Sequence, residues 1–174
     1  MKRLYLLRHA KAVAPDSDME DHDRALTVRG MHDASAIARY MRKNDMAPDL
    51  VLASSSTRTR QTAELTLREL EQSLAADIRE ALYLAEPGQI LAMLQAAPAT
   101  VMGAMVIGHN PGIEALATLL AREPVRRKER ARRDVLEEKF PTAALAVLEF
   151  DITRWRDLVP GEGKLVDFVR PRDL

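Results

Sequence analysis

The sequence predicts an α/β fold with three layers, in which helices cover both faces of a mostly parallel sheet of about six strands. Short apolar runs, typical of buried strands, alternate with segments whose apolar residues recur every three or four positions, as in amphipathic helices. Of the 174 residues, 47% are hydrophobic and 30% are charged, which is the composition of an ordinary globular protein. A chain of this length is expected to form one domain over residues 1–174.

The first half of the chain carries the signals of three strands and two helices. The apolar run Leu4–Leu7 predicts the first strand. Thr27 can cap the helix that follows an acidic loop. The apolar face of that helix consists of Ala34, Ile37, Ala38 and Met41. Leu50–Ala53 predicts a second strand, after which Ser54–Ser56 begin a second helix, and Asp77–Arg79 predicts a short third strand.

The second half of the chain adds two helices and three strands. Pro87 begins a helix, because proline is well tolerated in the first helical turn. Gly103–Ile107 predicts the fourth strand, and Asn110 then caps a helix with Pro111 at its first position. The last two strands are expected at residues 143–150 and 165–169.

Side chains with catalytic potential follow four of these strands. They are Arg8 and His9 after the first strand, Arg58 after the second, Glu80 after the third, and His109 and Asn110 after the fourth. The carboxyl ends of parallel strands share one edge of a sheet, and ligands bind at that edge. The helix starts after Ser54 and Asn110 add free N–H groups, which suit a phosphate. The sequence therefore predicts a pocket for an anionic substrate.

A pocket of this composition can transfer a phosphoryl group without a metal ion or another cofactor. Arginine side chains hold phosphate oxygens and offset their charge. A neutral imidazole is a nucleophile toward phosphorus, and nearby arginines disfavour its protonation. The second histidine can donate a hydrogen bond to the developing charge, and a carboxylic acid such as Glu80 can protonate a poor leaving group. That acid matters less for phosphohistidine, which has a good leaving group.

Three segments carry motifs of a known family, namely Leu7–Ala10, Ser54–Ala63 and Gly108–Gly112. They resemble the signatures of the histidine phosphatase superfamily, which has the phosphoglycerate-mutase-like fold. The third segment has the form typical of the small SixA-like phosphohistidine phosphatases, and residues 23–30 and 141–143 also fit that branch. The resemblance implies that His9 is the phosphorylated nucleophile. It also implies that Arg8, Arg58 and His109 complete the phosphate pocket, with Asn110 beside them.

The expected function is that of a metal-independent phosphatase that acts in two steps. His9 attacks phosphorus to form a phosphohistidine, which water then hydrolyses. The expected substrate is a phosphorylated protein that carries phosphohistidine, and the alternative substrate is a small phosphorylated metabolite. A phosphate- or phosphoprotein-binding module without turnover is the alternative from another class. A metal-dependent hydrolase is a further alternative, with ligands from His22, His32, Asp18, Asp21 and Asp23, whose spacing matches no metal-site template.

Charge and composition limit which partners the chain is expected to bind and where in the cell it is expected to act. The 26 basic residues balance the 26 acidic residues, so no overall field favours nucleic acid or a membrane surface. The chain has no cysteine, and no apolar stretch is long enough to span a bilayer, so a cytoplasmic location is expected. The basic segment Arg122–Arg133 is interspersed with acidic residues. It is expected to form a solvated helix face or a mobile loop, and binding of nucleic acid or an acidic partner is the alternative.

Overall fold

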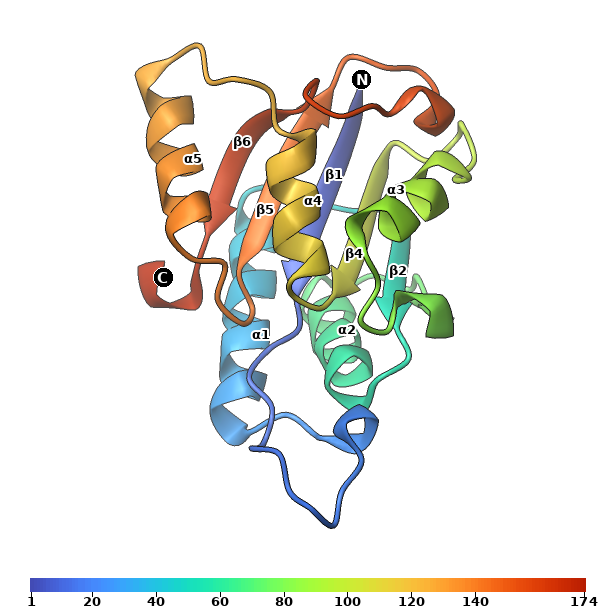
Figure 1. The fold of residues 1–174 in the computed structure, drawn as a ribbon, viewed down its shortest axis with the longest axis vertical. Coiled ribbons are helices and arrows are strands. Elements are labelled where there is room, and N and C mark those ends of the chain that lie inside the picture. The colour runs from blue at the N-terminus through green and yellow to red at the C-terminus, as the bar shows by residue number, and fades with distance from the viewer.

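One six-stranded sheet organises the chain, and helices cover both of its faces (Figure 1). A computed structural model describes residues 1–174. The strands are β1 (Lys2–Arg8), β2 (Leu50–Ser54), β3 (Asp77–Arg79), β4 (Gly103–Gly108), β5 (Leu145–Phe150) and β6 (Lys164–Val169), in the spatial order β3-β2-β4-β1-β5-β6. The pairs β1–β4, β2–β4 and β2–β3 are parallel, whereas β5 is antiparallel to both β1 and β6. The predicted α/β fold with a mostly parallel sheet is therefore confirmed.

Five helices form the outer layers of the fold. They are α1 (Val28–Lys43) and α2 (Thr57–Glu69) on one face, and α3 (Pro87–Gln95), α4 (Gly112–Leu120) and α5 (Arg127–Glu138) on the other. Helix α5 lies within the strongly charged part of the sequence and buries only Glu129 and Leu136. The part of the basic segment from Arg127 to Arg133 therefore lies in a helix whose surface is mainly solvated, as expected for a solvated helix face, whereas residues 122–126 precede the helix. No helix combines the length and the apolar character needed to cross a membrane.

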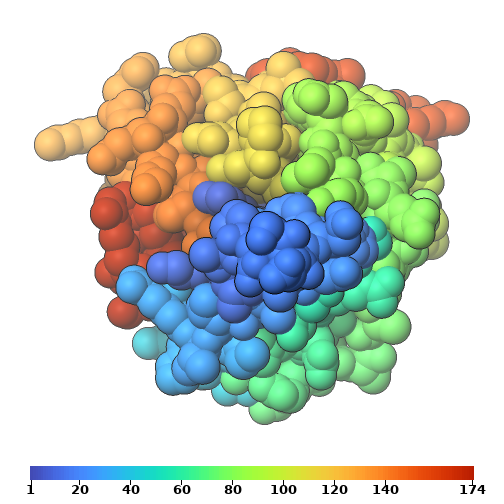
Figure 2. All heavy atoms as spheres, turned by 60° about the horizontal axis from the view of Figure 1, so that its bottom comes forward, coloured from blue at the N-terminus to red at the C-terminus, as the bar shows by residue number.

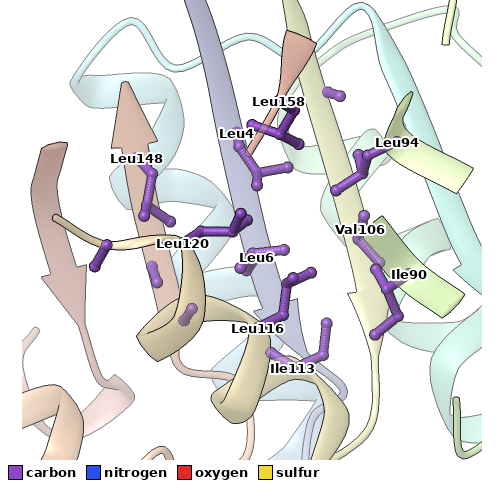
Figure 3. Packing of buried hydrophobic residues seen from close by; sticks show 14 of the residues in the cluster. Leu4, Leu6, Ile90, Leu94, Val106, Ile113, Leu116, Leu120, Leu148 and Leu158 are labelled. Carbon is purple, nitrogen blue, oxygen red and sulfur yellow. The ribbon is translucent and has the colours of Figure 1, made fainter. Parts of the chain in front are cut away.

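Two hydrophobic clusters, one on each face of the sheet, hold the layers together. Alternate residues of a strand point to opposite faces, so Leu4 and Leu6 of β1 join one cluster while Tyr5 and Leu7 join the other. Figure 3 shows the first cluster, in which side chains of β1 and β4 meet those of α3 and α4. Because both faces of the strand are buried, the first strand is a continuous apolar run in the sequence.

Local capping explains where several helices begin. The Thr27 hydroxyl accepts a hydrogen bond from the backbone N–H of Gly30 at 3.0 Å, which confirms the predicted cap of α1. The predicted start of α4 is wrong by one residue, because Pro111 occupies the N-cap position and the helix begins at Gly112. The Asn110 side chain accepts instead from the backbone N–H of Glu114 at 3.3 Å.

The fifth strand is shorter than the sequence predicts. It begins at Leu145 rather than Ala143, because Ala143 has a φ of 59° and belongs to a turn that starts at Pro141. The backbone N–H of Ala143 reaches the carbonyl oxygens of both Arg8 and His9 at 3.1 Å. This turn therefore lies directly beside the end of β1.

The carboxyl ends of five strands meet at one edge of the sheet. These are β1 to β4, together with β6, which is antiparallel to β5 and so runs in the direction of β1. The segment between β1 and α1 hangs below this edge in Figure 1, and in Figure 2 it lies over the middle of the surface there. This segment, residues 9–27, therefore covers the loops that carry the candidate site residues, and we call it the covering segment.

A glycine in the first turn of α1 permits the close approach of this covering segment. A Cβ atom on Gly30 would lie 2.1 Å from the carbonyl oxygen of Lys11, which is backbone and cannot move aside easily. We expect Gly30→Ala to lower the free energy of unfolding by about 1–3 kcal/mol, as overpacking does elsewhere. Thermal denaturation followed by circular dichroism measures this loss. Gly88→Ala in α3 is the control, because a Cβ atom on Gly88 would meet no heavy atom within 4 Å, and an equal loss in both variants would contradict the steric explanation.

Candidate active site

His9 lies just beyond the end of β1 and is almost fully buried, with 7% of its surface exposed. Its backbone N–H donates to the carbonyl oxygen of Gly108 at 3.0 Å, which fixes the residue between β1 and β4. Its Nδ1 lies 2.8 Å from the carbonyl oxygen of Ala10. Because a carbonyl oxygen only accepts, Nδ1 carries the proton and Nε2 keeps its lone pair. That Nε2 faces the guanidinium of Arg58, whose Nε lies 3.3 Å away.

His109 follows β4 and lies beside His9, with 5.1 Å between the ring centroids. Its Nδ1 is 3.2 Å from Nη2 of Arg58, so it accepts a hydrogen bond from the guanidinium. Its Nε2 is 2.7 Å from the hydroxyl oxygen of Ser54, at the end of β2. The two imidazoles therefore contact the same cation from two strand ends.

Both imidazoles are held in the neutral form. Burial, together with the positive charges of Arg58 and Arg8, lowers the pKa of His9 to about 4. Burial and the neighbouring His9 and Arg58 lower the pKa of His109 to about 3. His9 therefore retains the lone pair on Nε2 throughout the neutral pH range.

Two arginines supply the positive charge of the site. Arg58 lies in the first turn of α2 and is only 3% exposed. Arg8, at the end of β1, donates from Nη1 to the carbonyl oxygen of Phe140 at 3.0 Å. Its Nε is buried and has no hydrogen-bond partner within the protein. A buried donor of this kind favours an anionic ligand at the site.

Asp21, which the sequence indicated only as a candidate metal ligand, contributes a carboxylate to the candidate phosphate site. Its Oδ2 accepts hydrogen bonds from Nη2 of Arg58 at 3.1 Å and from the hydroxyl of Tyr83, and its carbonyl oxygen accepts from Nη1 of Arg58 at 2.8 Å. The hydrogen bond from Tyr83 and the charge of Arg58 lower the pKa of Asp21 to about 2. The acidic segment between β1 and α1 thus places an anion on the arginine of the pocket.

His22 stands next to Asp21 and also faces the site. Its Nε2 lies 2.9 Å from the hydroxyl oxygen of Ser55, and its ring packs edge-on against Tyr83 with 4.9 Å between centroids. Tyr83 in turn packs edge-on against His109 at 5.4 Å. The wall of the pocket therefore combines residues from the covering segment, the start of α2 and the turn after β3.

The structure brings together four of the predicted site residues and leaves the others at the margin. The four are Arg8, His9, Arg58 and His109. Asn110 is half-buried and donates to the same Phe140 carbonyl oxygen as Arg8, at 2.9 Å, so it supports the loop beside Arg8. Glu80 is exposed, and its side chain makes no hydrogen bond or ion pair with the four. The one sequence signal for Asp21 was the acidity of its loop opposite a cationic pocket.

The residues of the metal-site alternative do not converge. The structure contains no group of three or more histidine, aspartate or glutamate side chains that could hold a metal ion. His32 is exposed on α1, while His22 turns toward Ser55. What the site does offer is a nucleophilic nitrogen, a buried guanidinium and an unpaired guanidinium donor, which is a set suited to a phosphoryl group.

Comparison with known proteins agrees with this geometry. The profile of the "Histidine phosphatase superfamily (branch 1)" matches residues 4–122. The uncharacterised protein Rv1276c of Mycobacterium tuberculosis is 37% identical over 166 residues, which cover 95% of this chain and 100% of that protein. Candidate phosphohistidine phosphatases SixA from Agrobacterium tumefaciens and Nakamurella multipartitia are both 32% identical, with TM-scores of 0.79 and 0.81. Those structures align with 98% of this chain and with 98% and 96% of their own chains. The chain therefore belongs to branch 1 of the histidine phosphatase superfamily and to its SixA-like members.

Proposed function

We propose that this chain is a metal-independent phosphatase that hydrolyses phosphohistidine in a protein substrate, with His9 as the nucleophile. The observation that carries the proposal is the buried, neutral imidazole of His9, whose Nε2 faces Arg58 at 3.3 Å. The SixA structures at 32% identity are named as candidate phosphohistidine phosphatases, which supports this substrate class.

In the first step, the lone pair on Nε2 of His9 attacks phosphorus while the bond from phosphorus to the substrate nitrogen breaks. The electron pair of that bond leaves with the substrate imidazole, which departs as a neutral ring because its other nitrogen carries a proton taken from solvent. Arg58 and the free Nε–H of Arg8 hold the oxygens of the phosphoryl group and offset their charge. The hydrogen bond from Nδ1 of His9 to the Ala10 carbonyl oxygen stabilises the positive ring that forms.

In the second step, water attacks phosphorus, the bond to Nε2 breaks, and His9 regains its lone pair as phosphate leaves. In both steps His109 would donate a hydrogen bond to a phosphoryl oxygen in place of the one that its Nδ1 accepts from Arg58. This requires its proton on Nδ1, and the Ser54 hydroxyl permits either tautomer because it both donates and accepts. His109 would thus exchange its contact with Arg58 for a contact with the phosphoryl group.

The protonation state of the pocket favours phosphohistidine over an alkyl phosphate. An alkoxide needs a proton when it leaves, whereas a substrate imidazole leaves readily. With a pKa of about 2, Asp21 is ionised near neutral pH and holds no proton to give. Glu80 is exposed and lies away from the contacts of His9. The pocket therefore lacks a protonated carboxyl group suited to an alcohol leaving group.

The direct test of the mechanism is to trap the phosphorylated enzyme. Rapid quenching with a labelled phosphohistidine substrate should place an acid-labile, base-stable phosphoryl group on the peptide that contains His9. His9→Ala should show no such label, because it lacks the attacking nitrogen. His32→Ala removes an exposed histidine of α1 and should label like the wild type. Wild-type labelling in His9→Ala would overturn the assignment of the nucleophile.

The leaving-group argument predicts a specific order of substrates. The value of kcat/KM should be high for phosphohistidine, intermediate for p-nitrophenyl phosphate and low for alkyl phosphates, since only the last need a proton donor. Glu80→Gln should slow phosphohistidine cleavage by less than about tenfold. Fast wild-type cleavage of a sugar phosphate, lost by about a hundredfold in Glu80→Gln, would instead identify Glu80 as the acid and a small metabolite as the substrate.

Asp21 shares Arg58 with the phosphoryl group, so its charge opposes anion binding. We expect Asp21→Asn to strengthen competitive inhibition by orthophosphate about three- to tenfold, because like charges about 4 Å apart repel by about 1 kcal/mol even with the full screening of water. Inhibition constants against p-nitrophenyl phosphate provide the measurement. Asp18→Asn is the matched control, since Asp18 lies exposed in the same loop and its side chain does not contact Arg58. Unchanged or weaker inhibition in Asp21→Asn would show that this carboxylate does not compete for the pocket.

A further inference from the structure

A cationic cavity lined by Lys11 lies near the candidate active site, and the proposed mechanism does not use it. It has a volume of about 220 Å³, and none of its lining residues is hydrophobic. Its positive charge comes from Lys11, Arg29, Arg170 and Arg172, and Asp33, Pro141, Thr142 and Pro171 complete its wall. We call these eight residues the side cleft.

The side cleft adjoins His9 through the chain itself. Lys11 is the second residue after His9. Even in a fully extended chain, the Cα atoms of two such residues are at most about 7 Å apart. On the other wall, Pro141 and Thr142 lead into Ala143, whose N–H donates to the carbonyl oxygens of Arg8 and His9. Two short stretches of backbone therefore connect the side cleft to His9, so a group bound there would lie on the same side of the molecule as a phosphoryl group on His9.

The walls of the side cleft are held in place by hydrogen bonds. The Lys11 carbonyl oxygen accepts from the backbone N–H of Thr27 at 2.9 Å and from its hydroxyl at 3.2 Å. Arg170 is fixed by two hydrogen bonds from its guanidinium to Asp173, at 2.9 and 3.0 Å. The Lys11 backbone and the Arg170 guanidinium are thus held in fixed positions. A cavity with fixed walls is suited to recognise a ligand of defined shape.

The side cleft has an excess of positive charge. Asp33 is the acidic residue that lines it, and its carboxylate lies 3.9 Å from Nε of Arg29. Arg170 is compensated by Asp173. Lys11 and Arg172 are exposed, and their side chains form no ion pair. The side cleft therefore carries two cations without a carboxylate partner, Lys11 and Arg172.

We propose that the side cleft binds an acidic side chain of the protein substrate, close to the phosphohistidine that enters the pocket. This inference rests on the proposed function and adds a sequence preference to it. A carboxylate side chain can enter the cavity, and it complements the lack of apolar lining and the unpaired cations. The enzyme would therefore select phosphohistidines that stand in an acidic environment.

Two phosphohistidine peptides test the proposal, one with glutamates at the flanking positions and one with glutamines there. For the wild type, kcat/KM should be about three- to tenfold higher for the glutamate peptide, mainly through a lower KM, as exposed ion pairs allow. The preference should decline at high salt. The double variant Lys11→Gln, Arg172→Gln should reduce the ratio between the two peptides to near one, and the glutamine peptide reports whether the variant remains active.

A matched control separates the side cleft from a general effect of charge. Arg126→Gln, Arg130→Gln removes the same charge from exposed positions at the α5 end of the molecule, and it should keep the wild-type ratio. An equal loss of preference in this control, or equal wild-type rates on both peptides, would overturn the side-cleft proposal alone. A wild-type enzyme that cleaves p-nitrophenyl phosphate but neither peptide would overturn the proposed function, and the side-cleft proposal with it.

Discussion

The buried guanidinium of Arg58 is the interaction on which the candidate site depends. A cation withdrawn from water needs partners for its donors, and Arg58 finds them in both imidazoles and in Asp21. The same charge helps to keep His9 and His109 neutral and Asp21 ionised. Arg58 thus reinforces protonation states that burial, for the two imidazoles, and the Tyr83 hydrogen bond, for Asp21, favour first.

The position of Arg58 is secured by hydroxyl groups at the start of α2. The Thr62 hydroxyl accepts from the backbone N–H of Ala10 at 3.0 Å and donates to the carbonyl oxygen of Arg58 at 2.7 Å. Thr62 thereby joins the end of β1 to the first turn of α2. An apolar residue at this buried position would leave the Ala10 N–H without a partner, which is costly in a protein interior. The end of β2 and the first turns of α2 are rich in serine and threonine residues. Five of them are buried, namely Ser54, Ser55, Ser56, Thr59 and Thr62.

Most of the fold and the centre of the site could be predicted from the sequence. Strands buried on both faces appear as apolar runs in the sequence. The parallel strands bring Arg8, His9, Arg58 and His109 to one edge of the sheet, whatever path the loops take beyond it. The position of Asp21 could not be predicted in this way. It depends on how a loop without regular periodicity folds back over the sheet, which is decided by contacts with Arg58 and Tyr83 from distant parts of the chain. Glu80 shows the opposite case, since a residue at the correct strand end can still face solvent.

The covering segment has the character of an Ω-loop, with a closed base and a free tip. A β-bridge between Ala12 and Leu26 joins its two ends, and the Leu26 N–H donates to the Gln61 side chain at 2.8 Å. At the tip, residues 16–19 form an exposed turn. Since doubling the length of a flexible loop costs only about 0.6 kcal/mol, insertions at the tip are tolerable as long as the base stays closed. The length of the loop tip can therefore vary during evolution and change the shape of the entrance to the site. The residues around the nucleophile can keep their geometry as it does so.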